Sequence, residues 1–230
     1  MRPDLVILDL DGTIIDHRGA VRQALDLWLP AFGQVSGDEL FEAWIAAENR
    51  HFPAWRSREI SFAEQRRRRL RDFLPLIGQP VGDEDELDRV FDGYASAYAA
   101  SWAAYPDAEP ALEVLAASGV RLAVLTNGTD EQQNAKLSAV GLQGKTGPVF
   151  SSEALGVAKP GHRSYLEVCD RMQAQPSRTV HVGDLHDLDV VAPRQAGLQA
   201  IHLDRYDAGP HTERLRASSL AQVPGVIAGI

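Results

Sequence analysis

The chain has 230 residues, of which 44% are hydrophobic and 24% charged, so it can bury a large core in one or two domains. Its formal net charge of -9 argues against nucleic acid or an anionic membrane surface as a partner, since both select basic faces. Cys169 is the only cysteine, which excludes a disulfide framework and a thiolate metal site. No signal peptide follows Met1 and no apolar run is long enough for a membrane span, so we expect a cytoplasmic protein.

The first predicted element is a buried strand, because the apolar run Leu5–Leu8 leads directly into carboxylates and a glycine. In an open α/β sheet, ligands bind at the carboxyl ends of the strands. Asp9 and Asp11 point the same way if the strand geometry persists, and this spacing suits a nucleophile beside an acid/base. Asp11-Gly12 is also a common turn dipeptide, so these residues alone leave open a strand that only ends in a polar turn.

A helical insertion follows, since the sequence from about Ala20 to Ala104 has helical periodicity and no clear strand. The predicted helices cover residues 21–29, 37–48, 61–73 and 83–104. Ser61 begins a capping box, and acids cluster at the start of the last helix, where the helix dipole favours them. All four tryptophans lie in this segment, and we expect most of them to pack between helices.

Cations in the insertion are candidates for substrate contact. The run Arg66–Arg69, with Arg71, cannot meet a single ligand from a helix, because successive residues point around the axis. A solvated, salt-bridged face is therefore predicted, with one arginine reaching an anion as the alternative. The segment His51–Arg58 mixes aromatic residues with cations, and we interpret it as a loop that contacts substrate.

The alternation of strands and helices resumes after Pro106, which ends the insertion, and Asp107 is expected to cap the next helix. The predicted elements are helices over 109–117 and 162–171, strands over 121–125, 179–183 and 198–203, and a closing segment over 220–227. Cys169 lies among helix-forming residues and is predicted to be a core residue.

Two segments offer groups that could bind an anion. Thr126, Asn127 and Gly128 follow the second strand, where a hydroxyl and backbone N–H groups can face an anion. The same residues are also compatible with a turn and a helix cap. Lys159 precedes a Pro-Gly turn and a predicted helix, which holds its side chain near a helix N-terminus.

An acidic cluster follows the strand over 179–183. Asp184, Asp187 and Asp189 would repel one another unless they are dispersed, used as caps or neutralised by a cation. A hard divalent metal with oxygen ligands explains the cluster economically. His186 is interpreted as a solvated loop residue, because magnesium prefers oxygen.

The order of these motifs resembles the haloacid dehalogenase (HAD) superfamily over the whole chain. The motifs are Asp9-x-Asp11-Gly12-Thr13, Thr126-Asn127-Gly128, Lys159-Pro160, and Gly183-Asp184 with Asp189. Most of them follow an apolar strand, and the segment 20–104 matches the position of the family's helical type 1 cap. The phrases over 125–128 and 153–160 look most like the nucleotidase and N-acylneuraminate phosphatase branches.

The resemblance implies a mechanism. Asp9 would attack phosphorus and form an aspartyl-phosphate that water then hydrolyses. Asp11 would protonate the leaving oxygen and later accept a proton from the water. Mg2+ would be bound by Asp9, the backbone carbonyl of Asp11, and Asp184.

The resemblance also implies which residues bind the phosphoryl group. Thr126, the backbone of Asn127, and Lys159 would contact its oxygens, and Asp189 would hold Lys159 or a metal-bound water. Haloacid dehalogenases carry a different residue at position 11, because they displace halide and need no acid. An acid there favours a phosphatase. The family commonly has Ser or Thr after Asp184, where this chain has Leu185.

We therefore predict an α/β fold with a Rossmannoid parallel-sheet core, residues 1–15 and 106–230, and an inserted all-helical cap domain, residues 16–105. The predicted function is a Mg2+-dependent phosphatase of a small phosphorylated metabolite, with no nucleic-acid or membrane partner, acting as a monomer or homodimer. The alternatives are a phosphomutase of a sugar phosphate, a haloacid dehalogenase, and a non-catalytic binding protein with the same fold.

Overall fold

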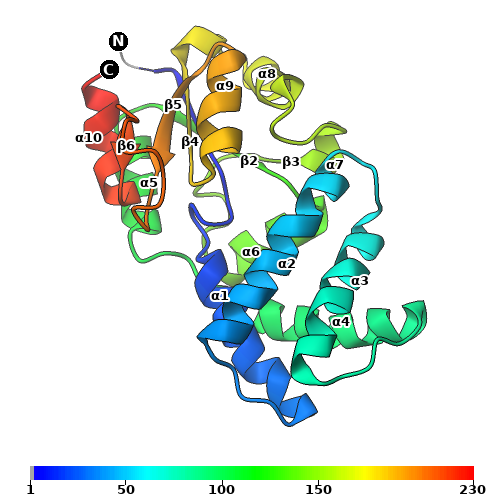
Figure 1. Cartoon of the computed structure of the whole chain (residues 1–230). Coiled ribbons are helices and arrows are strands. Elements are labelled where there is room, and N and C mark those ends of the chain that lie inside the picture. Colours follow the sequence, from blue (N-terminus) through cyan, green and yellow to red (C-terminus); the bar gives the residue numbers. More distant parts are fainter. Residues whose placement is uncertain (1–2) are drawn as a thin grey trace. The chain divides into compact units, whose positions relative to one another are not determined.

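The computed structural model describes residues 3–230, and the chain divides into two compact units (Figure 1). The core comprises the residues up to Asp16 together with Ala103–Ile230, and the cap is His17–Trp102. The sequence-based division, with its boundaries at residues 15/16 and 105/106, assigns Asp16 and residues 103–105 to the cap. These residues belong to the core, where the Asp16 N–H donates to the Ala103 carbonyl at 2.9 Å.

The core contains a six-stranded sheet in the order β3-β2-β1-β4-β5-β6, with every neighbouring pair parallel. The strands are β1 (Leu5–Leu8), β2 (Arg121–Thr126), β3 (Val149–Ser151), β4 (Thr179–Gly183), β5 (Gln199–Leu203) and β6 (Arg216–Ala217). The short edge strands β3 and β6 were not predicted. In β1, Leu8 lies opposite Val124 of β2 and Val182 of β4. The strand order reverses beside β1, and such a switch point is where open α/β sheets bind ligands.

Helices bury both faces of this sheet. The core helices are α5 (Ala108–Ala117), α6 (Asp130–Ala139), α7 (Ser152–Leu155), α8 (His162–Arg171), α9 (Ala192–Gln195) and α10 (Val223–Ala228), with 3-10 turns at Pro176–Arg178 and Leu220–Gln222 and a π-helical segment at His186–Val191. Side chains of β1 alternate between two hydrophobic clusters, since successive strand residues face opposite ways. Val6 and Leu8 lie with residues of α5 and α10, and Leu5 and Ile7 lie with residues of α8 and α9. Cys169 of α8 is buried in the second cluster, as predicted.

The cap is helical throughout, and residues 17–102, all of which are described, contain no strand. Its helices are α1 (His17–Trp28), α2 (Asp38–Arg56), α3 (Phe62–Phe73) and α4 (Glu84–Ala100), with 3-10 turns at Leu29–Phe32 and Leu74–Ile77. Trp44 is fully buried at its centre and packs against Trp28, Phe73 and Tyr94. The cap thus has an aromatic core of its own. Over residues 3–230, no helix is long and apolar enough to cross a membrane.

Two local predictions are wrong. The segment His51–Arg58 is no loop over most of its length, because α2 continues to Arg56 and its backbone bonds extend past the predicted end at residue 48. Asp107 precedes α5 but makes no side-chain capping bond. Its carboxylate instead receives two bonds from Arg205 and one from the Leu220 N–H, and these partners come from a distant part of the chain.

The arginine run on α3 is only partly a solvated face. Three of its members pair with cap carboxylates, as a salt-bridged face predicts. Arg69 is different, since it is 4% exposed, ion-paired to Glu48 at 2.7 Å and stacked 4.5 Å over the Trp44 ring. The helical period places this one position on the inner face of α3, where aromatic rings cover the guanidinium.

Candidate active site

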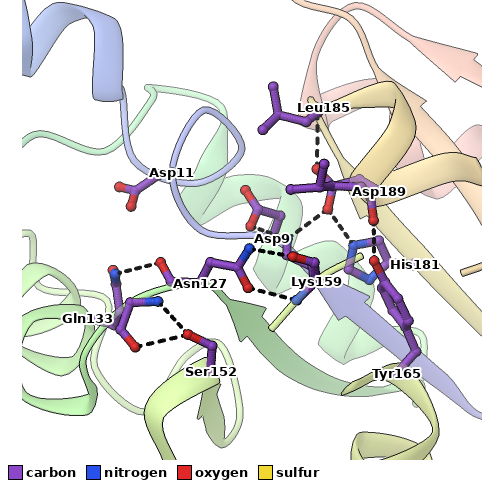
Figure 2. Close-up of polar contacts among 12 residues, drawn as sticks. Asp9, Asp11, Asn127, Gln133, Ser152, Lys159, Tyr165, His181, Leu185 and Asp189 are labelled. Carbon is purple, nitrogen blue, oxygen red and sulfur yellow. Dashed lines mark hydrogen bonds and ion pairs between the residues drawn. The ribbon is translucent and has the colours of Figure 1, made fainter. Parts of the chain in front are cut away.

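A lysine bridges two carboxylates at the carboxyl end of the sheet (Figure 2). The Lys159 Nζ donates to Asp9 Oδ1 at 2.5 Å and to Asp189 Oδ1 at 2.7 Å, and all three side chains are buried. Burial by itself lowers the pKa of Lys159, but the Asp189 and Asp9 charges outweigh burial and raise that pKa above its ordinary value. Lys159 therefore stays an ammonium at neutral pH, next to the carboxylate that follows β1.

Asp189 lies in the π-helical segment after β4 and is held at both oxygens. Its Oδ1 contacts His181 Nε2 at 2.9 Å as well as Lys159, and its Oδ2 accepts the Leu185 N–H at 3.0 Å. Burial raises the pKa of Asp189, but the Lys159 charge and the His181 hydrogen bond outweigh burial and hold that pKa well below its usual range. Asp189 is thus an ionised anchor for Lys159.

The acidic cluster fits a divalent cation. One ligand atom from each of Asp9, Asp184 and Asp189 lies within 4.8 Å of the others. Within residues 3–230, Asp184 Oδ1 is buried without a hydrogen-bond partner, whereas both oxygens of Asp189 are engaged. Burial raises the pKa of Asp9 to about 7, and burial with the Asp9 charge raises the pKa of Asp184 well above its ordinary value. Asp9 and Asp184 therefore have both the oxygen donors and the excess negative charge that Mg2+ would satisfy.

Two glycines leave room for these carboxylates. At Gly12, where φ is +84°, an added Cβ would lie 2.3 Å from Asp184 Oδ2. At Gly183, an added Cβ would lie 2.4 Å from the Asp189 Cγ. Glycine is required at both positions because the acids pack directly against the backbone, and this packing joins the first and last motifs of the sequence.

Asn127 connects the second motif to the third. Its Nδ2 donates to the Lys159 carbonyl and its Oδ1 accepts the Lys159 N–H, both at 2.9 Å (Figure 2). The Gly128 N–H donates to Ser152 Oγ at 3.0 Å, so at this residue the structure agrees with the alternative of a turn. Thr126 is the buried last residue of β2. The structure thus places Asn127 beside Lys159, directly after Thr126 in the chain.

Asp11 has a partner that the sequence analysis did not identify. The Lys136 Nζ lies 2.7 Å from Asp11 Oδ1 and 2.5 Å from Oδ2, and the lysine comes from α6. No motif marks Lys136. His181 was also missed, although a histidine inside an otherwise apolar strand was a visible signal of a buried polar contact.

The chain belongs to the haloacid dehalogenase-like hydrolase family, whose family model matches residues 3–197. It is 34% identical over 122 residues to a ribulose-1,5-bisphosphate 5-phosphatase from Halopiger xanaduensis, a match to 53% of this chain and 51% of the relative. The chain thus spans about half the length of that relative. It is also 26% identical over 215 residues to (S)-2-haloacid dehalogenase 4A from Burkholderia cepacia, covering 90% and 85% of the two chains.

The fold is shared with solved structures. The HAD-hydrolase YfnB from Bacillus subtilis, in a form bound to magnesium, superposes with a TM-score of 0.86 at 20% identity and covers 99% of this chain and 100% of its own. Identity at this level supports the fold only. The predicted α/β fold and the predicted superfamily are both confirmed, whereas the nucleotidase-like branch stays a prediction.

Proposed function

We propose that this protein is a Mg2+-dependent phosphatase that hydrolyses a small phosphomonoester through an aspartyl-phosphate on Asp9. The observation that carries the proposal is the buried Lys159 ammonium bonded to Asp9, at the strand end where Asp184 Oδ1 has no hydrogen-bond partner among residues 3–230. Membership of a hydrolase family and a phosphatase among the relatives support it.

Thr126, the Asn127 backbone and Lys159 would bind the oxygens of the phosphoryl group and stabilise the negative charge that spreads over these oxygens. Because Lys159 also contacts Asp9, a phosphoryl oxygen bound by Lys159 would lie next to the attacking carboxylate. Mg2+, held by Asp9, Asp184 and the backbone carbonyl of Asp11, would supply charge that screens the phosphate from the nucleophile. Asp189 keeps Lys159 in position.

The reaction then proceeds in two displacements. A carboxylate oxygen of Asp9 forms a bond to phosphorus, the bond from phosphorus to the ester oxygen breaks, and Asp11 gives that oxygen its proton. Water next attacks phosphorus and loses a proton to Asp11, and the bond to Asp9 breaks. Inorganic phosphate leaves, and both carboxyl groups return to their starting forms.

Asp11 also favours a phosphatase over a dehalogenase. An alcohol leaves well only when its oxygen is protonated, whereas a halide leaves without a proton, so only the first reaction uses an acid at position 11. Because the chain is similar to a haloacid dehalogenase, the experiment must also measure halide release.

The proposal covers a cytoplasmic enzyme that acts as a monomer or homodimer on a small phosphorylated metabolite. The negative net charge supports a small substrate held by local cations over a polyanion such as nucleic acid. The substrates favoured by the nucleotidase-like and N-acylneuraminate phosphatase-like phrases are nucleoside monophosphates and acylated sugar phosphates.

The test is phosphate release from a panel of phosphomonoesters, with Mg2+ and with EDTA, and halide release from 2-chloropropionate. We expect Mg2+-dependent phosphate release that Asp9→Asn abolishes. Asp26→Asn is the matched control, since Asp26 is an exposed acid on cap helix α1. Halide release without phosphate release would identify a dehalogenase. Phosphoryl transfer to a sugar phosphate without free phosphate would identify a mutase, and no turnover would leave a binding protein.

A further inference from the structure

A second buried lysine pairs with the proposed acid/base. Lys136 is 2% exposed, and its Nζ contacts both carboxylate oxygens of Asp11, which lies 125 residues earlier in the chain. Lysine side chains are rarely this buried unless they are paired, because removing an ammonium from water is costly. The two contacts therefore indicate a built interaction rather than a chance surface pair.

Lys145, on the core surface, differs from Lys136. Lys145 is 42% exposed at its side chain and forms its ion pair with Glu109, whose side chain is 51% exposed. Exposed ion pairs of this kind contribute little to the stability of the fold. Lys136 thus differs from Lys145 both in burial and in contacting a residue of the proposed reaction.

Asp11 lies in a turn that follows β1. The chain leaves the sheet after β1 and turns back, with Gly12 at φ +84° and a bridge between Asp11 and Ile15. Asp11 therefore lies beyond the end of β1, in a turn. In Figure 2 its carboxylate lies apart from that of Asp9. Such a separation suits the reaction, because the attacking and leaving oxygens stand on opposite sides of phosphorus.

We propose that Lys136 is a positioning residue that fixes the Asp11 carboxylate for the second displacement, in which Asp11 accepts a proton from the attacking water. This inference rests on the proposed phosphatase function. Contacts to both oxygens of a carboxylate restrict its rotation about the Cβ–Cγ bond as well as its place. The paired carboxylate is the form of Asp11 that the second displacement uses, so Lys136 contributes most to that step.

The experiment compares Lys136→Met with wild type, using 4-nitrophenyl phosphate and Mg2+. The 4-nitrophenolate group leaves without protonation, so phosphorylation of Asp9 depends little on Asp11 with this substrate. General base catalysis contributes about 100-fold to 10,000-fold, so losing its orientation should lower kcat by about 10-fold to 100-fold. Because kcat/KM reports the steps up to aspartyl-phosphate formation, we expect kcat/KM to stay within about 3-fold. An initial burst of 4-nitrophenol should accompany phosphoenzyme that acid quenching traps.

Two further variants separate positioning from structural damage. Lys136→Arg keeps the cation and should restore kcat to within about 5-fold of wild type. Lys145→Met should match wild type in both constants. If Lys136→Met does not fold, Lys136→Gln takes its place with the same expectation. Equal losses in kcat and kcat/KM, or no loss, would overturn the role of Lys136 while the phosphatase stands. A wild-type enzyme that forms no phosphoenzyme and releases no phosphate would overturn the proposed function and the inference together.

Discussion

Lys159→Met should destabilise the core, and by an amount that depends on pH. The substitution removes an ammonium bonded to two buried carboxylates, at 2.5 and 2.7 Å, and keeps the side-chain length. Breaking a buried ion pair from one side costs about 3–5 kcal/mol. Asp189 retains its bonds to His181 and the Leu185 N–H, so we expect the lower end, about 3 kcal/mol near neutral pH.

The pH dependence follows from the pKa shifts. Lys159 lowers the pKa of Asp189 and of Asp9, so its removal raises both, while burial continues to raise them. A folded-state pKa above the unfolded value of about 3.9 makes the folded state bind more protons, and stability then falls as the pH rises. The depression of the Asp189 pKa stabilises wild type above about pH 4, and the variant lacks this contribution. The loss should therefore be larger at pH 8 than at pH 5.

Urea unfolding at pH 5 and pH 8 in EDTA measures both effects, with equal m values showing that the same surface unfolds. For a chain of this length, about 3 kcal/mol corresponds to a Tm lowered by about 6–12 °C. Lys145→Met is the control and should lose less than about 1 kcal/mol, because Lys145 is exposed. A Lys159→Met variant that loses under about 1 kcal/mol, or the same amount at both pH values, would refute the reasoning.

Two other substitutions test the site and the cap. Asn127→Ala removes both hydrogen bonds to the Lys159 backbone, so phosphatase kcat/KM should fall about 10-fold, through the loss of about 1–2 kcal/mol of positioning. Asn134→Ala is the control and should not change kcat/KM. Equal kcat/KM values for the two variants would contradict a role of Asn127 in positioning Lys159. Trp44→Ala leaves a cavity at the centre of the cap and should lower the free energy of unfolding by about 3–5 kcal/mol. Urea titrations followed by fluorescence measure this change. A loss below about 1 kcal/mol would show that the cap repacks around the smaller side chain.

The sequence alone was enough to predict the features that residues close together in the chain determine, namely strands, helices and helix caps. Apolar runs followed by acids or hydroxyls predicted strands that end in functional groups, and the structure places Asp9, Thr126 and Asp184 at those ends. Parallel strands bring their carboxyl ends to one edge, so strand prediction was enough to expect these groups together. The helical period of the insertion, and Ser61 as the N-cap of α3, were equally readable, because both are set within a few residues.

Only the tertiary structure decided which side chains pair across long separations. Asp107 looked like a helix cap but binds Arg205, and Arg69 looked like one of several solvated arginines but is buried over Trp44. The partner of Asp11 is Lys136, which no motif marks. Hydrophobic period and turn chemistry report local geometry, whereas the partner of a long charged side chain depends on which helix packs beside which strand end, and that is a property of the folded chain.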